Sequence, residues 1–294
     1  MTDKNKISSY ILIAILAVVW GSSFILMKMG LEVYTWGQVG AFRMLVSFIV
    51  LVPFIWNKLK LIDEKSWKFI AVSGICGNGI PAFLFPLAET KIDSALAGII
   101  NSLTPLFTLI VGLIFFGTLF SIRRISGVLL GLGGALLIIL TKTQDIVSIH
   151  VDYSLLVVLA TFCYAFSVNV LRHKLASVDA ILITGFALMF AGIPSGVYLF
   201  TTDFISRTQS SEGALYGLLA ILVLAVFGTA ISTFLFNKLI KISSALFASS
   251  VTYFIPFVAI LWGIGFGEVL GITHLVGLSA ILLGVYLINR KGSS

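Results

Sequence analysis

The sequence KIDSAL at residues 91–96 recurs as KISSAL at residues 241–246, which is 150 positions later. The same shift aligns Phe116-Gly117 with Phe266-Gly267, and Gly134 with Gly284, without any gap. Shared hydrophobicity produces scattered matches, whereas a gap-free register that includes a matched hexapeptide indicates a duplication. We therefore predict that the chain consists of two related halves.

The composition indicates what kind of protein this repeat builds. Of the 294 residues, 59% are hydrophobic and only 11% are charged, whereas a soluble domain normally carries about 25% charged residues. So few polar groups cannot cover a surface in water, but an apolar surface is what a lipid bilayer requires. The chain is predicted to be an all-α membrane protein without a soluble domain.

The apolar residues fall into runs of the length that a membrane helix needs, which is roughly 20 residues. We find ten such runs, joined by short connections. The first run lacks the cleavage site of a signal peptide, so we expect it to stay in the protein. The predicted spans are Tyr10–Met29, Trp36–Trp56, Trp67–Ala88, Ser94–Gly117, Ile122–Leu140, Tyr153–Leu171, Ala180–Phe200, Leu215–Asn237, Ser244–Phe266 and Ile272–Asn289.

The basic residues are distributed unequally between the two sides of these spans. With the N-terminus in the cytoplasm, 14 fall on the cytoplasmic side and three, Lys91, Lys142 and Arg207, on the outer side. The positive-inside rule therefore predicts that both termini are cytoplasmic. It also explains the net charge of +7, so nucleic-acid binding is not needed to explain that charge. The inner residues are Lys4, Lys6, Lys58, Lys60, Lys65, Lys68, Arg123, Arg124, Arg172, Lys174, Lys238, Lys241, Arg290 and Lys291.

Ten spans in two halves give five spans to each, over residues 1–143 and 144–294. Because five is odd, the second half enters the membrane from the opposite side, which makes an inverted repeat. Secondary transporters commonly have this architecture, with the substrate site near the midplane between the repeats. Spans 1, 3, 4, 6, 8 and 9 are expected to line that site. Spans 5 and 10, which carry stripes of small residues for close helix packing, are expected to be peripheral.

Several short motifs occur in a fixed order along the chain. They are WGSSF at residues 20–24, Arg43, SAL at 94–96 followed by PLF at 105–107, FGTA at 227–230, and Ser244-Ala245 followed by Pro256. Together they resemble the drug/metabolite transporter superfamily, specifically its ten-helix EamA-type members. The resemblance implies a multi-pass permease of the bacterial inner membrane, often an exporter of amino acids or related metabolites.

Polar residues deep in a membrane are costly, so each is a candidate for function. Arg43 stands out because an Arg side chain stays charged; it either faces a cavity and attracts an anionic group, or snorkels outward. Asparagines and aromatic residues at midspan either contact substrate or pack between helices. The predicted substrate-binding residues are Trp20, Ser23, Arg43, Asn78, Asn101, Tyr164, Asn169, Ser249 and Tyr253.

Prolines and glycines interrupt spans 3, 4 and 9. A proline inside a helix removes a backbone donor, and interrupted helices are the usual pointer to a transport site. Gating and simple kinks are both open readings. The candidate gating positions are Gly77, Gly79, Pro81, Pro86, Pro105 and Pro256.

What the spans lack narrows the function further. Glu32, Glu89 and Glu268 lie near span ends, so no midspan carboxylate is an evident proton carrier. Facilitated movement or exchange is favoured, and coupling through Glu89 or through the substrate stays open. No P-loop, metal site or cofactor motif is expected, and an enzyme is disfavoured because acids and histidines do not converge at depth.

The function predicted from the sequence is secondary transport of small polar metabolites, amino acids or their relatives, outward across the inner membrane. A drug or nucleotide-sugar carrier is the alternative within transport, and a structural or assembly subunit is the alternative outside it. The expected partners are a small-molecule substrate and the lipid bilayer. The oligomeric state is left open, with a monomer as one option.

The charge distribution generates a topology test. A fluorescent protein fused after Ser294 should fold in the cytoplasm and fluoresce, and alkaline phosphatase fused there should be inactive. Phosphatase inserted in the loop of residues 201–213 should be active. An active phosphatase at the C-terminus would contradict the cytoplasmic assignment.

Overall fold

The computed structural model describes residues 3–117, 122–140, 151–268 and 271–289, and within these ranges all regular secondary structure is helical. The helices are α1 (Asp3–Leu31), α2 (Trp36–Ile55), η1 (Leu59–Leu61), α3 (Glu64–Gly74), η2 (Ile75–Gly79), α4 (Ile80–Glu89), α5 (Ser94–Asn101), α6 (Thr104–Phe115), α7 (Ile122–Leu140), α8 (Val151–Lys174), α9 (Ala180–Phe200), α10 (Phe204–Ser210), α11 (Ala214–Ala225), η3 (Val226–Ile231), α12 (Ser232–Ile242), α13 (Ala245–Ser249), η4 (Ser250–Tyr253), α14 (Ile255–Gly265) and α15 (Ile272–Asn289).

Eight helical stretches of the described chain are long and apolar enough to cross a membrane. They are Ile7–Leu31, Trp36–Ile55, Glu64–Glu89, Ser94–Phe115, Val151–Lys174, Ala180–Phe200, Ala214–Ile242 and Phe247–Gly265. The other two predicted spans are α7 and α15, whose apolar parts, Ser126–Leu137 and Ile272–Gly284, are shorter. The predicted boundary between residues 143 and 144, and the charges Lys142, Arg290 and Lys291, lie outside the described residues.

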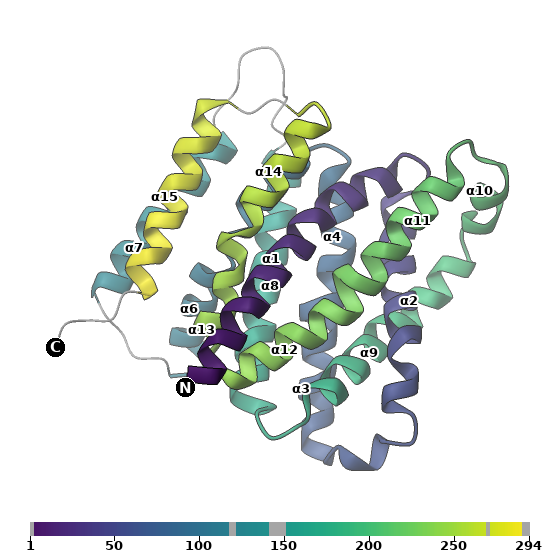
Figure 1. Cartoon of the computed structure of the whole chain (residues 1–294), viewed down its shortest axis with the longest axis horizontal. Helices are drawn as coiled ribbons and strands as arrows, with labels where there is room; N and C mark the ends of the chain where they lie inside the picture. The colour runs from purple at the N-terminus through teal and green to yellow at the C-terminus, as the bar shows by residue number, and fades with distance from the viewer. Residues whose placement is uncertain (1–2, 118–121, 141–150, 269–270, 290–294) are drawn as a thin grey trace.

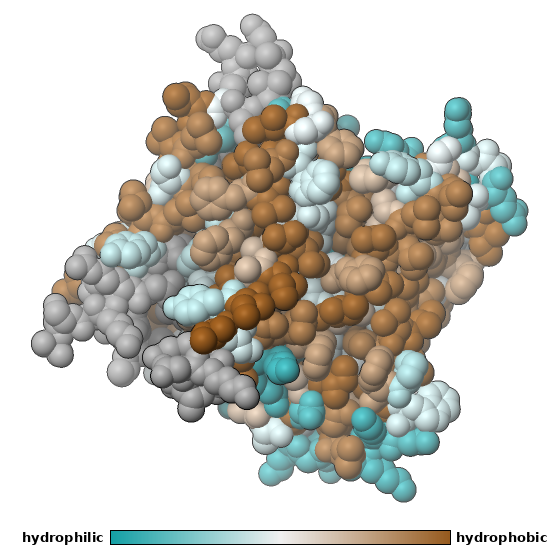
Figure 2. Space-filling view, viewed as in Figure 1, coloured by the Kyte–Doolittle hydropathy of each residue, from teal (hydrophilic) through white to brown (hydrophobic). Residues whose placement is uncertain are grey.

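The outer surface of the bundle suits a bilayer. Figure 2 shows a mostly apolar face over α1, α11, α12 and α14, with hydrophilic groups gathered toward its ends. In Figure 1 the start of α1 and the end of α15 lie at the same end of the bundle. The chain is a multi-pass membrane protein.

The helices of the first half pack mainly against helices of the second half. The α1 helix contacts α11, α12 and α14, the α2 helix contacts α9, and both α4 and α6 contact α8. This interleaving places the interrupted parts of the spans together in the middle of the bundle. The cavity described below lies between these helices.

Four spans of the described chain are interrupted, and the sequence predicted three of them, spans 3, 4 and 9. Span 3 passes through the π-helical turn η2 between α3 and α4, and span 8 has a matching π-helical turn, η3. Span 4 breaks between α5 and α6, and span 9 between α13 and α14. Pro81, Pro105 and Pro256 each lie in the first turn of the helix after the interruption, where a missing N–H costs little. Pro86 lies inside α4 without ending it.

Some backbone features recur about 150 residues apart. Gly117 and Gly267, which are 150 residues apart, both end a span with a positive φ, of 65° and 85°. Glycine adopts this conformation without the steric penalty of a side chain. Gly77 in η2 and Gly228 in η3 likewise occupy matching positions, 151 residues apart.

Helices α7 and α15 pack against each other at one edge of the bundle (Figure 1). A Cβ atom on Gly284 would lie 2.4 Å from the backbone oxygen of Gly127, and one on Gly134 would lie 2.7 Å from that of Gly277. The small-residue stripes therefore let two backbones approach closely, as predicted for spans 5 and 10. The structure places this contact within one chain, which the sequence left open.

The close contact between α7 and α15 predicts that two glycine-to-alanine substitutions have opposite effects on stability. Gly284→Ala should destabilise the protein by about 1–3 kcal/mol, because the added methyl group meets backbone that cannot move aside. Gly133→Ala is the matched control: its Cβ would meet nothing within 4 Å, and alanine favours a helix over glycine. Thermal unfolding in detergent should rank Gly284→Ala below the native protein and Gly133→Ala level with it or above. Equal midpoints for the two variants would contradict the close packing.

Candidate functional site

A cavity lies in the middle of the bundle between the two halves, with about 100 Å³ of space for the centres of water-sized molecules. Every described span except α7 and α15 contributes to the wall. The lining residues are Trp20, Ser23, Phe24, Met27, Arg43, Met44, Ser73, Gly77, Asn78, Phe85, Asn101, Thr104, Tyr164, Ser167, Val168, Leu171, Ala187, Gly228, Thr229, Thr233, Phe236, Asn237, Thr252 and Ile255.

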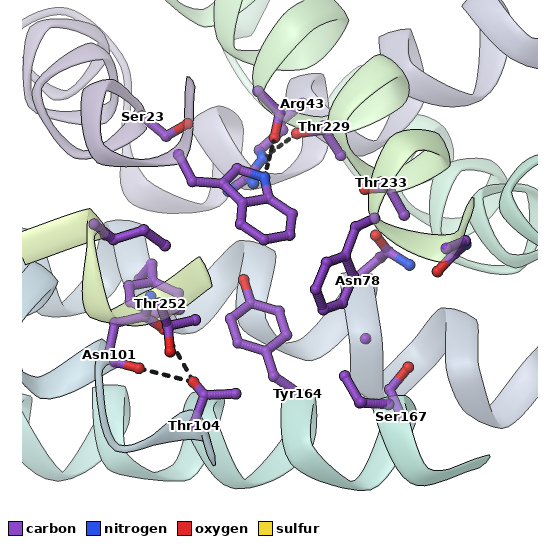
Figure 3. Close-up of a pocket in the computed structure, with 18 of the residues that line it drawn as sticks. Ser23, Arg43, Asn78, Asn101, Thr104, Tyr164, Ser167, Thr229, Thr233 and Thr252 are labelled. Carbon is purple, nitrogen blue, oxygen red and sulfur yellow. Dashed lines mark hydrogen bonds between the residues drawn. The ribbon is translucent and has the colours of Figure 1, made fainter. Parts of the chain in front are cut away.

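Arg43 of α2 provides the charge in this wall. Its side chain is 8% exposed, and its Nε donates a hydrogen bond of 2.6 Å to Oγ1 of Thr229 (Figure 3). Its Nη1 lies 3.9 Å from the sulfur of Met27. Among the described residues, no carboxylate forms an ion pair with this guanidinium. The side chain therefore faces the cavity and does not snorkel outward.

The π-helical turn η3 explains why Thr229 is available to Arg43. In a π-helix each backbone hydrogen bond joins residues i and i+5, whereas in an α-helix it joins residues i and i+4. The backbone groups of the turn therefore have different partners than they would in an α-helix. Thr229 donates its hydroxyl proton to the carbonyl of Leu224, five residues earlier, at 3.1 Å. Its oxygen is then an acceptor for Arg43. The turn and the guanidinium thus hold each other in place.

Trp20 crosses from α1 to the same turn. Its indole nitrogen donates to the carbonyl of Gly228 at 3.1 Å and to Oγ of Ser232 at 3.0 Å. The ring packs edge-on against Phe236, with 5.0 Å between centroids. Trp20 is therefore fixed at mid-depth by hydrogen bonds to span 8, and its ring forms part of the cavity wall.

The remaining wall combines aromatic and hydroxyl groups. Tyr164 of α8 stacks on Phe85, with 5.9 Å between ring centroids, and Figure 3 shows its hydroxyl pointing into the space between Arg43 and Asn101. Asn101 lies beside Thr104 at the break between α5 and α6, and Thr252 faces them from η4. Such a site offers donors and acceptors on one side and ring faces on the other.

Toward the predicted cytoplasmic end, spans 3 and 6 touch through two serines. Ser73 and Ser167 share a hydrogen bond of 2.9 Å. A Cβ on Gly77 would come within 2.3 Å of the Ser167 hydroxyl oxygen. Gly77, which lies in the π-helical turn, therefore allows the close approach of the two helices.

At the opposite end an ionic network closes the space between α1, α5 and α14. Lys28 of α1 pairs with Glu268 at 2.8 Å and with Asp93 at 3.5 Å. Glu268 also accepts hydrogen bonds of 2.9 Å from the backbone N–H groups of Ser94 and Ala95. A carboxylate at a helix N-terminus is stabilised by the helix dipole and by the free N–H groups. This network links the first half of the chain to the second.

The structure divides the predicted residues into two groups. Trp20, Ser23, Arg43, Asn78, Asn101 and Tyr164 line the cavity, as does Gly77 among the helix-breaking positions. Asn169, Ser249 and Tyr253 lie outside the lining, as do Gly79, Pro81, Pro86, Pro105 and Pro256.

Asn169 illustrates why a midspan amide is ambiguous. Its side-chain nitrogen donates to the carbonyls of Thr108 and Ala165, both at 2.9 Å, so it joins α8 to α6. Ser249 is fully buried, and Tyr253 is half-buried at the end of η4. None of the three is positioned by this structure to touch a ligand in the cavity.

Sequence reasoning missed the hydroxyl-bearing wall and one amide, Asn237. The hydroxyl-bearing residues that line the cavity are Ser73, Thr104, Ser167, Thr229, Thr233 and Thr252. One signal was available: Thr229 lies in the FGTA motif beside Gly228. Serine and threonine are common in membrane helices because their hydroxyl can bond to their own helix, so their presence alone does not mark a site.

The comparisons with known proteins identify the family of this chain. The EamA-like transporter family profile matches the chain twice, over residues 7–140 and 153–290. The chain belongs to the EamA-like transporter family. Through that family it is a member of the drug/metabolite transporter superfamily, whose members are transporters and not enzymes, and it has a general transport role.

Relatives of this EamA-like chain occur in all three domains of life. It is 26% identical over 288 residues to a WAT1-related chloroplastic protein of Arabidopsis thaliana, covering 92% of this chain and 66% of that protein. It is 25% identical to an uncharacterized transporter of Archaeoglobus fulgidus, over 96% of this chain and 99% of that one. It is 26% identical to the uncharacterized inner membrane transporter YedA of Escherichia coli, over 93% and 88%.

A solved crystal structure has the same fold as this EamA-like chain. The two superpose with a TM-score of 0.66 over 96% of each chain, at 14% sequence identity. In the described ranges, no cluster of three or more His, Cys, Asp or Glu residues could hold a metal ion.

The bond between Arg43 and Thr229 predicts the behaviour of two variants. Thr229→Val has the same shape but no hydroxyl, so it leaves the buried Nε without that acceptor, at a cost of about 1.5–3 kcal/mol. Thr229→Ser keeps the hydroxyl and should stay close to the native protein. Thermal unfolding in detergent measures the difference. A valine variant as stable as the serine variant would show that the bond contributes nothing to the fold.

Proposed function

We propose that this protein is a secondary transporter that moves small polar metabolites bearing a carboxylate, amino acids or their relatives, by alternating access at the central cavity. The buried guanidinium of Arg43, without an ion-paired carboxylate among the described residues, carries this proposal. A charge at such depth in a membrane protein normally serves a substrate or ion pathway. The planar fork of a guanidinium matches a carboxylate with two parallel hydrogen bonds.

The rest of the wall suits the other parts of an amino acid. The amide oxygens of Asn78 and Asn101 and the hydroxyls of Thr104 and Thr252 can accept hydrogen bonds from an ammonium group. The rings of Trp20, Tyr164, Phe24 and Phe85 provide apolar contact for a side chain. This combination favours a small zwitterion over a purely apolar compound.

The proposed architecture is ten spans in two inverted repeats, residues 1–143 and 144–294, with both termini in the cytoplasm. Three observations support it. The family profile matches the two halves separately. The π-helical turns and the span-ending glycines recur at equivalent positions. The basic residues divide 14 to three between the predicted inner and outer sides.

The proposed location is the bacterial inner membrane and the proposed direction is efflux. The printed name of the Escherichia coli relative supports the location. The proposed direction follows from the family resemblance, which implies export of amino acids or related metabolites. The lining extends to Leu171 and Asn237, near the predicted cytoplasmic ends of their spans, and the ion pair of Lys28 and Glu268 lies toward the predicted outer end.

A drug or nucleotide-sugar carrier is the second candidate. The apolar side chains of Met27, Met44 and Phe236 in the wall favour it, because methionine surfaces adapt to varied ligands. A structural or assembly subunit has no use for a lined cavity and is disfavoured. Proteoliposomes preloaded with individual amino acids, with nucleotide sugars or with lipophilic cations separate the candidates, since only the true substrate class exchanges with its labelled form.

Substitutions of Arg43 test the carboxylate site. Arg43→Gln removes the charge and should weaken the apparent affinity for an acidic or zwitterionic substrate by about 10- to 100-fold, the equivalent of a charged hydrogen bond. Arg43→Lys keeps the charge without the fork and should have a smaller effect. Labelled-substrate exchange in proteoliposomes gives both values.

The control is Arg207→Gln, which removes a charge at an exposed position beyond the spans. It should leave the apparent affinity unchanged. Native affinity for zwitterionic substrates in Arg43→Gln would mean that the guanidinium does not bind the carboxylate.

A further inference from the structure

Glu89, the last residue of α4, is buried although the sequence places it at the end of a span. Its side chain is 5% exposed. Within the part of the chain that the structure describes, neither of its carboxyl oxygens has a hydrogen-bond partner. It differs in this from Glu268, whose oxygens are bonded to Lys28 and to two backbone N–H groups.

The cations around Glu89 do not pair with it. Lys28 and Arg43 act on it electrostatically, and Glu268 adds a like charge. Lys28 forms its ion pairs with Glu268 and Asp93. Arg43 donates its Nε hydrogen bond to Thr229 and, among the described residues, forms no ion pair with Glu89.

The helices packed against α4 add no other close cation. They are α8, α2, α1 and α5, with η2 next to the opposite end of α4. The α1 and α2 helices contribute Lys28 and Arg43, and the start of α5 contributes Asp93. The α8 helix carries Asp152 and Tyr153 at its outer end and Tyr164 further in.

A carboxylate withdrawn from water without a hydrogen bond is strongly disfavoured, and such a group takes up a proton instead. The protonated form removes one negative charge from the neighbourhood of Arg43. An uncompensated guanidinium then attracts an anion more strongly, whereas an ionised Glu89 would weaken that attraction. Proton binding at Glu89 and carboxylate binding at Arg43 therefore favour each other, and this coupling is reciprocal.

We propose that Glu89 is a proton-binding site, protonated in this conformation, whose proton is co-bound with the anionic substrate group at Arg43. The transport part of this proposal rests on the proposed function: substrate and proton cross together, and the proton passes to water when the outer end of α4 opens. Outward flow of a metabolite down its own gradient then carries a proton with it. Glu89, which the sequence left open as a coupling residue, is thus a carboxyl group that tertiary packing buries.

Infrared difference spectroscopy of the full-length protein in lipid vesicles tests the site without any substrate. The carbonyl band of a protonated carboxylic acid should be present at neutral pH, disappear as the pH is raised, and be missing in Glu89→Gln. Glu32→Gln, at an exposed position on the same side, should retain the band. Glu89→Asp keeps a carboxyl group and should also retain a band, so a folding defect of one variant does not decide the outcome.

The coupling has its own readout. In Arg43→Gln the pH at which the band disappears should rise by about one unit, because a positive neighbour that favours the ionised form is gone. In the native protein, net efflux of a preloaded amino acid into medium without amino acid should carry protons out, so an internal pH dye should report a rising internal pH. Glu89→Gln should abolish this rise, whereas one-for-one exchange of labelled for unlabelled amino acid should leave the internal pH unchanged.

A band that persists in Glu89→Gln, or no band in the native protein, overturns the proton site. A band midpoint that does not move in Arg43→Gln overturns the coupling. If the band behaves as expected and no amino acid is exchanged, the proton site stands and the proposed substrate class fails.

Discussion

In a bilayer an unpaired backbone amide or carbonyl finds no water, so each interruption of a membrane helix must be satisfied by protein. This constraint organises the centre of the molecule. The indole of Trp20, from the first half, bonds the carbonyl of Gly228 in the π-helical turn of the second. Glu268, from the second half, accepts the N–H groups of Ser94 and Ala95 at the start of a broken span of the first. Each half thus stabilises the irregular backbone of the other, and the cavity exists because they do so together.

The all-helical membrane class was predictable because its signal is additive along the chain. Apolar runs sum over many residues, so local accidents do not hide them. The ten-span count, the inverted repeat and the orientation of the termini stay predictions. The small-residue stripes of α7 and α15 were readable for a related reason: only close backbone approach explains glycines such as Gly127 and Gly284 in register. The boundaries of the interrupted helices could not be predicted from the sequence, because a π-helical turn has no distinct residue pattern.

Cavity-lining residues could be predicted from the sequence where burying their side chain in lipid costs free energy. Lining residues without that cost could not be recognised. Arg43 and Asn78 stand out in an apolar run. Thr229 does not, because its hydroxyl is satisfied by the carbonyl of Leu224 in its own span. Burying the amide of Asn169 in lipid would also cost free energy, but this amide bonds to backbone carbonyls and joins two helices. Glu89 was judged by its distance from the end of a run, and only the packing of neighbouring helices reveals that water is excluded from it.

Each π-helical turn changes which face of its span points toward lipid. Successive residues of an α-helix are separated by about 100° around the axis, so a turn that takes in one extra residue rotates everything beyond it by that angle. A single helical wheel through residues 64–89 therefore superimposes two faces that point in different directions, that of α3 and that of α4. Lipid-facing and interior positions of this span, and of α11 and α12 around η3, separate cleanly only when each piece is given a wheel of its own.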